Sequence, residues 1–294
     1  MLLNVTPERL RDSMGSSELS DELERGRILR FGRCPIELPP AEDLDLLRGL
    51  GPHLSRKNVS WYFEDDRLVG VGPELRERTR RILSAHSARV RAFFAAAMPG
   101  FFRGARPGTT SFRPLQEKGR HLSPHASNEL VHVDAGAYGA THGDRILRFF
   151  VNVHPEEPRV WASRGTFREL FARHGREAGI DDGRVEPGPF DRAWTGALRL
   201  AGRALPALRM IDTSPYDRRM RRFHNYMKDA KAFRDTREGE QRFEFAPFSA
   251  WTCLTDAVSH ACLSGQHALV DTFIVPLSNG TQREHAPWNV LAGR

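Results

Sequence analysis

The chain has 294 residues, of which 39% are apolar and 28% are charged, and its formal net charge at pH 7 is +7. This length and composition indicate a soluble globular protein with a sizeable core. The sequence has no run of about 18 apolar residues, and its N-terminus lacks the basic and apolar segments of a secretory signal. We therefore expect neither a transmembrane helix nor secretion.

The cysteines and the basic residues set the expected compartment and partners. Cys34, Cys253 and Cys262 are too few, and odd in number, for a disulfide framework, so a reducing cytoplasm is expected. The positive charge is mostly arginine, which favours bidentate recognition of phosphate or carboxylate groups. Nucleic acid, a membrane surface and a phosphorylated substrate remain open as partners. So does the simpler explanation that the codon usage of the genome favours arginine.

Residues 1–104 are predicted to form an N-terminal helical layer. Its strongest element is a helix over residues 74–98, where apolar side chains recur at helical spacing until Pro99 and Gly100. The other elements expected here are a loosely held helical arm at 1–26, a strand at 27–31, a helix starting at 39–43 and an extended segment at 56–61.

Residues 105–276 are predicted to form a β core, interrupted by a helical insertion at about 165–237. The strands are expected at 110–114, 129–134, 144–154, 159–161, 242–245, 250–255, 257–259 and 269–275, with a turn at 263–266. The inserted helices are expected at 167–178, 190–208 and 212–234, the last opened by N-cap residues. A loop-like tail follows residue 278. The whole chain then forms one α+β domain over 1–294.

The segment Leu130-Val131-His132-Val133-Asp134 carries the first candidate for chemistry. In a β-strand, side chains two residues apart point to the same side, so His132 and Asp134 would project into one cavity. The distant His260 could complete a 2-His-1-carboxylate triad, which leaves three coordination positions open on iron(II). The alternative is that Asp134 caps a turn and that His132 is a hydrogen-bonded core residue.

The strand at 144–154 has one apolar face and one partly polar face. The apolar face holds Leu147, Phe149, Val151 and Val153, and the other holds Arg148, Phe150, Asn152 and His154. A buried arginine needs an anion, and the carboxylate of a cosubstrate would serve. The alternative is that Arg148 faces solvent.

Several segments together resemble the 3-deoxy-D-manno-oct-2-ulosonic acid (Kdo) hydroxylase family. The segments are residues 132–135, 145–155, 157–161, 251–266 and 56–60, and the resemblance extends over about residues 23–276. It implies an iron(II)- and 2-oxoglutarate-dependent dioxygenase on a double-stranded β-helix, a jelly-roll or cupin-like core. It also implies that His132, Asp134 and His260 hold the iron, that O2 is consumed, and that the product is 3-hydroxylated Kdo (Ko) in the inner core of lipopolysaccharide.

One departure concerns the arginine that pairs with the far carboxylate of 2-oxoglutarate. Many such oxygenases carry it about ten residues after the distal histidine, but residues 261–276 contain neither arginine nor lysine. The candidates for this role are Arg148 and Arg159, with Asn152 and Gln266 as hydrogen-bond partners. A further set of cations could reach the carboxylates of the sugar: Arg56, Lys57, Arg113 and Lys118.

The basic segment 214–237 suggests where the substrate is met. Met220, Phe223 and Met227 form an apolar stripe on a helix rich in arginine, which suits either an ordinary surface helix or a face that meets an anionic leaflet. The resemblance implies a Kdo-containing lipid A precursor or lipopolysaccharide core as partner. We therefore expect a cytoplasmic protein with peripheral contact to the inner membrane. Nucleic acid is not expected, because few aromatic residues interrupt the basic run.

Other functions stay open at this point. One is a 2-oxoglutarate oxygenase that acts on another anionic sugar or lipid, and another is a non-catalytic, basic jelly-roll module that binds glycolipid. A zinc cluster of Cys253, His260 and Cys262 has a spacing unlike the usual structural zinc patterns and lacks an evident fourth ligand.

Overall fold

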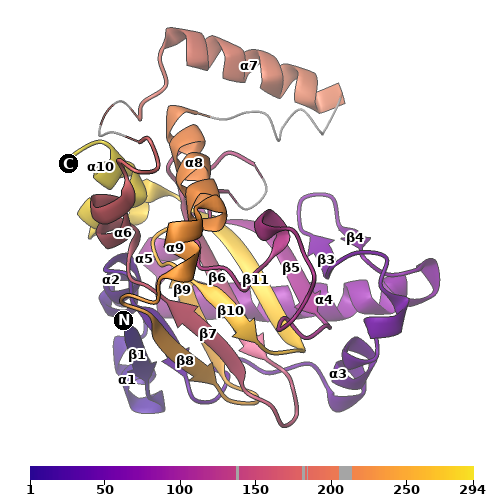
Figure 1. Ribbon diagram of the computed structural model, residues 1–294. Coiled ribbons are helices and arrows are strands. Elements are labelled where there is room, and N and C mark those ends of the chain that lie inside the picture. Colours follow the sequence, from indigo (N-terminus) through magenta and orange to yellow (C-terminus); the bar gives the residue numbers. More distant parts are fainter. Residues whose placement is uncertain (137–138, 181–182, 184, 205–213) are drawn as a thin grey trace.

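The computed structural model describes residues 1–294 except 137–138, 181–182, 184 and 205–213 (Figure 1). Its strands are β1 (Leu2–Val5), β2 (Ile28–Phe31), β3 (Val59–Tyr62), β4 (Arg67–Val69), β5 (Arg106–Arg113), β6 (Arg145–Asn152), β7 (Arg159–Ser163), β8 (Gln241–Phe245), β9 (Ala250–Leu254), β10 (Ala261–Ser264) and β11 (Ala268–Val275). Its α-helices are α1 (Pro7–Ser13), α2 (Glu18–Glu24), α3 (Ala41–Arg48), α4 (Pro73–Ala97), α5 (Pro99–Phe102), α6 (Phe167–His174), α7 (Pro189–Ala204), α8 (Pro215–Asp229), α9 (Lys231–Asp235) and α10 (Pro287–Leu291).

The strands form two sheets. The large sheet has the order β1-β2-β9-β6-β11-β5-β3-β4, and the small sheet has the order β10-β7-β8. Neighbouring strands are antiparallel except for β1 and β2, which are parallel. After β5 the chain passes repeatedly from one sheet to the other: β6 and β9 are in the large sheet, β7, β8 and β10 are in the small one, and β11 returns to the large one.

Aromatic side chains fill the space between the two sheets. Trp251 of the large sheet lies 5.4 Å from Trp161 of the small sheet, measured between ring centroids, and 3.9 Å from Phe245. Phe150 of β6 also contacts Trp161, at 4.7 Å. These rings belong to one buried cluster with Cys253, Cys262 and other apolar residues, so the inner faces of both sheets share one core.

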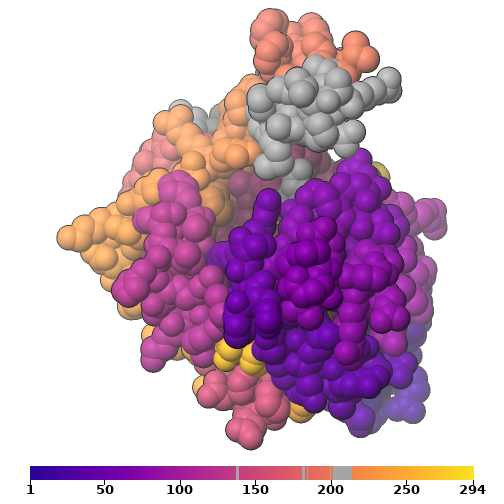
Figure 2. Space-filling model, turned by 90° about the vertical axis from the view of Figure 1, so that its right-hand side faces the viewer, coloured from indigo at the N-terminus to yellow at the C-terminus, as the bar shows by residue number. Residues whose placement is uncertain are grey.

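Helix α4 covers the outer face of the large sheet, as Figure 1 shows. Phe94 of α4 packs with its ring centroid 5.7 Å from those of both Phe149 and Phe273. The predicted apolar face of the segment 144–154 is confirmed, because Leu147, Phe149, Val151 and Val153 all belong to one buried cluster with Phe94 and Phe273. In Figure 2 the N-terminal residues, coloured indigo to purple, cover much of the side of the molecule that faces the viewer. Helix α4 thus packs on the sheet, but residues 1–104 are not a purely helical layer, because β1, β2, β3 and β4 are strands of the large sheet itself.

The N-terminal arm differs from the prediction. Residues 2–5 form β1, which pairs in parallel with β2 and extends the large sheet. Leu19 and Leu23 of α2 are fully buried, so this segment is part of the core rather than loosely held. A four-residue strand followed by short polar helices has too few residues for a hydrophobic periodicity to show in the sequence. The strand is defined by its pairing with β2, which is a tertiary contact.

Other predicted boundaries move for local reasons. The long inserted helix breaks at Ala230 into α8 and α9, and the expected strand at 257–259 is a turn that ends in an isolated bridge. The predicted turn at 263–266 overlaps the end of β10, where the register shifts between Cys262 and Ser264. The tail is not all loop, since α10 follows residue 286. The end of the predicted helix 190–208 and the start of the predicted helix 212–234 fall partly outside the described residues.

Candidate metal centre and its cavity

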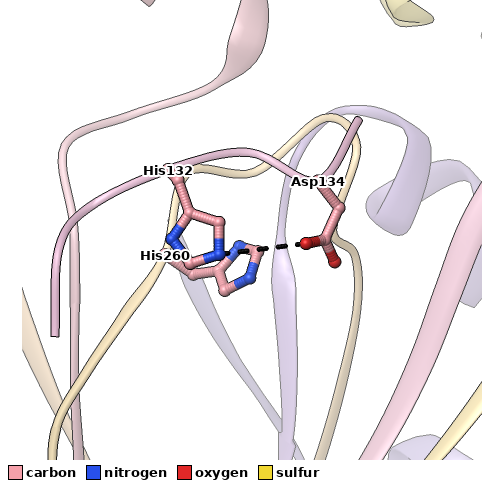
Figure 3. A group of neighbouring side chains, drawn as sticks. All are labelled: His132, Asp134 and His260. Carbon is pink, nitrogen blue, oxygen red and sulfur yellow. Dashed lines mark ion pairs between the residues drawn. The ribbon is translucent and has the colours of Figure 1, made fainter. Parts of the chain in front are cut away.

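His132, Asp134 and His260 come together at one edge of the small sheet. One ligand atom from each residue lies within 4.8 Å of the other two, and all three side chains are buried. Figure 3 shows the two imidazoles and the carboxylate turned toward a common point. Among the residues that the structure describes, this is the group of histidine, cysteine and acidic side chains that could hold a metal ion.

Backbone pairing positions the three residues, although the predicted strand at 129–134 does not form. His132 and His260 exchange backbone hydrogen bonds of 3.1 and 2.8 Å in an isolated antiparallel bridge beside β10. The Asp134 amide donates to the carbonyl of Thr255 at 2.8 Å. The expectation that residues 132 and 134 project together thus holds through this single bridge rather than through a regular strand.

Backbone carbonyls also orient both imidazoles. Nδ1 of His132 lies 2.7 Å from the carbonyl oxygen of Leu130, and Nδ1 of His260 lies 3.0 Å from that of Val258. A carbonyl only accepts, so the hydrogen-bond network assigns the proton to Nδ1 and leaves the Nε2 lone pair for a metal. Burial lowers the pKa of His132, and burial lowers the pKa of His260 to about 4. Both rings are therefore neutral at pH 7, as metal ligation requires.

Arg148 of β6 holds the carboxylate of the triad. Its Nη2 lies 3.1 Å from Oδ2 of Asp134, while Oδ1 of Asp134 lies 3.8 Å from Nε2 of His132. Burial alone would raise the pKa of Asp134, but Arg148 and the two histidines hold that pKa well below its usual value. The carboxylate is therefore ionised and keeps one oxygen directed at the imidazoles.

The donor set fits iron(II). Two neutral imidazole nitrogens and one carboxylate form the facial arrangement of non-heme iron oxygenases, with three coordination positions left for other ligands. The cysteines do not join it: Cys253 and Cys262 are buried, and burial raises the pKa of both thiols. The zinc reading of the sequence gains no support, because Cys253 and Cys262 are absent from the metal-holding group.

A cavity of about 310 Å³ opens onto the triad. It is lined by Lys57, Arg113, His125, Ala126, Asn128, His132, Asp134, Arg148, Phe150, Trp161, His224, Lys228, His260 and Cys262. The ring of Trp161 stacks on His260 with a centroid distance of 5.4 Å. A larger hollow of about 570 Å³ lies beside α3 and α4, but it contains none of the triad residues. The cavity at the triad therefore has the better claim to be the functional site.

A buried carboxylate gathers further arginines beside this cavity. Glu117, which is 1% exposed, lies 3.3 Å from Nη2 of Arg159 and 3.5 Å from Nη1 of Arg113. Arg120 approaches the same carboxylate at 3.7 Å. Nη1 of Arg159 and Nε of Arg113 are buried without a hydrogen-bond partner. One carboxylate thus faces three guanidinium groups, which leaves an excess of buried positive charge.

The predicted cosubstrate contacts occupy different places. Arg148 lines the cavity, and Arg159 lies behind it at Glu117. The amide of Asn152 donates to the carbonyls of Glu157 and Phe245, and the amide of Gln266 donates to that of Pro114. Neither of these two amides lines the cavity. Of the cations considered for the sugar, Lys57 and Arg113 line it, whereas Arg56 and Lys118 are exposed.

Sequence reasoning missed the residues that α8 contributes. His224 and Lys228 both line the cavity, and Nδ1 of His224 lies 2.7 Å from the carbonyl oxygen of Val133. They are four residues apart, so they share one face of the helix. The apolar stripe of Met220, Phe223 and Met227 is fully buried, as expected for a helix that packs on the core. The sequence could have indicated this role, because His224 and Lys228 lie next to the apolar stripe on the same helix.

Comparisons with known proteins agree with this geometry. Residues 8–293 match the family model for 3-deoxy-D-manno-oct-2-ulosonic acid (Kdo) hydroxylase. The fold is similar to the apo structure of the Kdo hydroxylase KdoO, described as a non-heme Fe(II) alphaketoglutarate-dependent dioxygenase, with a TM-score of 0.78, 24% identity and coverage of 99% of this chain and 95% of that one.

The cobalt(II) complex of KdoO gives a TM-score of 0.79 at 25% identity, with the same coverage of the two chains. The complex of KdoO with alphaketoglutarate and Fe(III) gives 0.78 at 24% identity, also with 99% and 95% coverage. No curated protein sequence matches. The family match over nearly the whole chain, together with the buried triad and its cavity, shows that this chain belongs to the Kdo hydroxylase family.

Proposed function

We propose that this protein is an iron(II)- and 2-oxoglutarate-dependent dioxygenase that hydroxylates Kdo at C3 in a lipid A precursor or lipopolysaccharide core. The observation that carries the proposal is the buried His132, Asp134 and His260 group at a cationic cavity, in a chain of the Kdo hydroxylase family. The similar structures of KdoO were obtained with alphaketoglutarate and Fe(III), and with succinate and Fe(III).

The two-sheet core is proposed to be a double-stranded β-helix within a single domain. β5, β11, β6 and β9 would form its major sheet, and β10, β7 and β8, with the isolated bridge between His132 and His260, its minor sheet. The alternation of the chain between the sheets supports this reading.

His132, Asp134 and His260 would hold the iron. When bound, iron(II) supplies oxygen activation with 2-oxoglutarate, a chemistry for which protein side chains are insufficient. The surrounding residues do the positioning: Arg148 fixes the carboxylate of Asp134, and backbone carbonyls fix both imidazoles. Phe150 and Trp161 form an apolar wall of the cavity, which excludes water from the reacting groups.

The far carboxylate of 2-oxoglutarate is proposed to bind the arginines at Glu117. Arg148 is paired with Asp134, a residue of the candidate triad, whereas Arg113 and Arg159 share Glu117, which is outside the triad. Nε of Arg113 and Nη1 of Arg159 are also buried without a hydrogen-bond partner. An incoming carboxylate would satisfy those groups. Of the residues predicted from the sequence to bind the cosubstrate, this proposal retains Arg159 and omits Arg148, Asn152 and Gln266. It adds Arg113.

The charge of the cavity supports an anionic substrate. Lys57, Arg113, Arg148 and Lys228 line it, and Asp134 is the single acidic residue among the lining residues, so the lysines and arginines outnumber the carboxylates by three. Iron(II) would raise this charge further. A dianionic cosubstrate and a sugar acid together bring compensating negative charge, whereas a neutral substrate would leave the excess in place.

Contact with a membrane surface is proposed to involve α7. No helix in the described part of the chain has the length and apolarity needed to cross a bilayer. Helix α7 lies on the outside of the molecule in Figure 1, and Phe190, Trp194 and Leu200 on it are 80%, 51% and 67% exposed. An amphipathic helix with exposed aromatic residues suits the interfacial region of a bilayer.

The double change Phe190→Ser with Trp194→Ser is expected to reduce binding to anionic phospholipid vesicles.

The metal assignment is tested by His132→Ala and His260→Ala. Each change removes one of three metal ligands, so iron-dependent conversion of 2-oxoglutarate to succinate is expected to fall by at least about 1,000-fold, measured by succinate formation. His285→Ala, which alters a histidine at the far C-terminal end of the chain, should retain the wild-type rate. Full turnover by either triad variant would refute the metal centre.

The substrate assignment is tested by mass spectrometry of Kdo-bearing lipid A precursor before and after incubation with the protein, iron(II) and 2-oxoglutarate. The expected product carries one more oxygen on Kdo. If Kdo stays unchanged and another anionic sugar or lipid stimulates succinate formation, the protein is instead an oxygenase that acts on that compound. Absence of any succinate formation would favour a binding module.

A further inference from the structure

Lysine is scarce in this chain, yet it is concentrated at the cavity. The sequence has 44 basic side chains, of which four are lysines and the remaining 40 are arginines. Two of the four, Lys57 and Lys228, are among the 14 residues that line the cavity. A random placement of four lysines among 294 positions would put about 0.2 of them there. This concentration suggests that the cavity needs ammonium groups, which are compact and flexible where guanidinium groups are planar.

The two lysines reach the same backbone segment from different elements. Lys57 precedes β3, and its Nζ donates to the carbonyl of Ala126 at 2.5 Å. Lys228 is in the last turn of α8, and its Nζ donates to the carbonyls of His125 and Ser127 at 3.2 and 3.0 Å. An ammonium group has three N–H donors. Lys57 therefore has two donors left for a ligand in the cavity, and Lys228 has one.

Neither lysine forms an ion pair with a described residue; the charge of Glu117 acts on Lys57, and that of Asp134 on Lys228, from beyond ion-pair distance. Of the four cations that line the cavity, Arg148 pairs with Asp134 and Arg113 pairs with Glu117. No carboxylate among the described residues forms an ion pair with Lys57 or Lys228, whose hydrogen-bond acceptors are neutral carbonyls. Burial lowers the pKa of Lys57 to about 8 and also lowers the pKa of Lys228, which is 3% exposed. Two ammonium groups so placed would be stabilised by an anionic ligand.

We propose that Lys57 and Lys228 form an ammonium pair that binds the carboxylate of the sugar acid and so orients the sugar toward the metal centre. This inference rests on the proposed function, which supplies a substrate with a carboxylate. The site differs from that of the cosubstrate, whose far carboxylate is assigned to Arg113 and Arg159. The proposed pair combines Lys57, which precedes β3, with Lys228 of α8. The sugar would therefore be held between two parts of the chain that are distant in sequence.

The test uses Lys57→Met and Lys228→Met, which keep the aliphatic length and remove the charge. Each full-length variant, loaded with iron(II), is assayed with Kdo-bearing lipid A precursor and, separately, without any sugar. We expect the KM for the sugar substrate to rise at least about tenfold in each variant. The KM for 2-oxoglutarate, measured without the sugar, should rise less than the KM for the sugar in each variant.

Lys118→Met and Lys231→Met are the matched controls, because both lysines are exposed and outside the cavity. They should leave the KM for the sugar unchanged. A second arm replaces the sugar by its methyl ester: wild type should bind the ester at least about tenfold more weakly than the acid, and the double variant should bind both equally.

Two results overturn the assignment while the proposed function stands: an unchanged KM for the sugar in both variants, or an increase confined to the KM for 2-oxoglutarate. If wild type itself leaves the sugar unmodified, the proposed substrate is wrong and the assignment falls with it. Because Lys57 and Lys228 are on separate elements, poor folding of one variant, detected by circular dichroism, leaves the other as the test.

Discussion

At the scale of single residues, Arg148 pairs with a carboxylate of the candidate metal centre. It lies on the face that turns away from the core shared with α4, as the alternation predicts, and reaches Asp134 at 3.1 Å. We propose that this guanidinium group orients a metal-ligating carboxylate. The sequence predicted an anion beside Arg148, and in the structure the carboxylate of Asp134 lies there.

This reading predicts that Arg148→Met lowers metal affinity by about 10- to 100-fold, because the carboxylate of Asp134 loses its orienting partner. The measurement is titration with cobalt(II) in the absence of cosubstrate. Arg159→Met serves as the comparison, since it should leave cobalt(II) affinity unchanged and raise the KM for 2-oxoglutarate. The opposite pattern would return the cosubstrate role to Arg148.

His267 is a second residue with a consequence that can be measured. Its ring lies between Phe112 and His154, at centroid distances of 6.1 and 5.2 Å, and Nδ1 has no hydrogen-bond partner. Burial lowers the pKa of His267 from its ordinary value of 6.5 to about 4. The unfolded chain therefore takes up a proton between these two pH values while the folded protein resists it.

It follows that the contribution of neutral His267 to stability is complete above pH 6.5 and is lost as the pH falls toward 4. We expect this residue to account for about 2 kcal/mol of the acid-induced loss, after allowing for the partial exposure of the ring. His267→Asn, which suits the left-handed backbone at φ 54°, should unfold with a shallower pH dependence. Identical urea midpoints for both proteins at pH 7, 6 and 5 would contradict this.

At the scale of elements, helix α8 links the insertion to the metal centre. Its N-terminus has a capping box, in which Ser214 and Asp217 bond each other's backbone amides and the serine hydroxyl donates to Asp217 at 2.6 Å. Asp217 also accepts from the amide of Thr141 at 2.7 Å. The helix start is thereby tied to the segment that follows Asp134, and the helix carries His224 and Lys228 into the cavity.

Asp217→Ala is expected to destabilise the protein by about 3 kcal/mol, because a buried carboxylate that accepts several hydrogen bonds is removed. Urea unfolding followed by circular dichroism measures the change. Asp235→Ala, at the exposed end of α9, should change the free energy of unfolding by less than about 0.5 kcal/mol. A loss of similar size in both variants would mean that the tie to Thr141 is unimportant.

At the scale of the whole molecule, the N-terminal helices α2 and α4 share a core with the large sheet. Side chains from α2, α4, β6 and β11 belong to one buried cluster, with Phe94 in contact with Phe149 and Phe273. Phe149 is on the same strand as Arg148, which pairs with Asp134 of the candidate metal centre. Packing on the outer face of the sheet therefore supports the site on its inner face.

Phe94→Ala should lower the free energy of unfolding by about 4 kcal/mol, because it leaves a cavity among fully buried rings. The helical signal and the near-ultraviolet signal of the tryptophans between the sheets should be lost in one transition, as expected if both layers fold together. Phe248→Ala, at a partly exposed ring, is the control. Two separate transitions in the wild type would contradict a shared core.

The sequence by itself determined the residues that could do the chemistry. His132, Asp134 and His260 were identified from one short motif and one distant histidine, because ligand chemistry restricts the residue types that suit iron(II). The strand at 144–154, its two faces and the long helix before Pro99 also followed from periodicity, since burial on one face repeats at a fixed interval. The family resemblance, read from the same segments, is confirmed by the family match.

Only the tertiary structure decided which cationic side chains meet in the cavity lining and at Glu117 behind it. Arg113, Glu117 and Arg159 are brought together by β5, the loop after it and β7, and Lys228 comes from a helix about 100 residues after that loop. A charged side chain has no periodic pattern that reveals its partner, because the partner is set by which strands and helices pack together. The same limit applies to β1 and to the bridge at His132, where pairing across the chain, rather than local pattern, determines the structure.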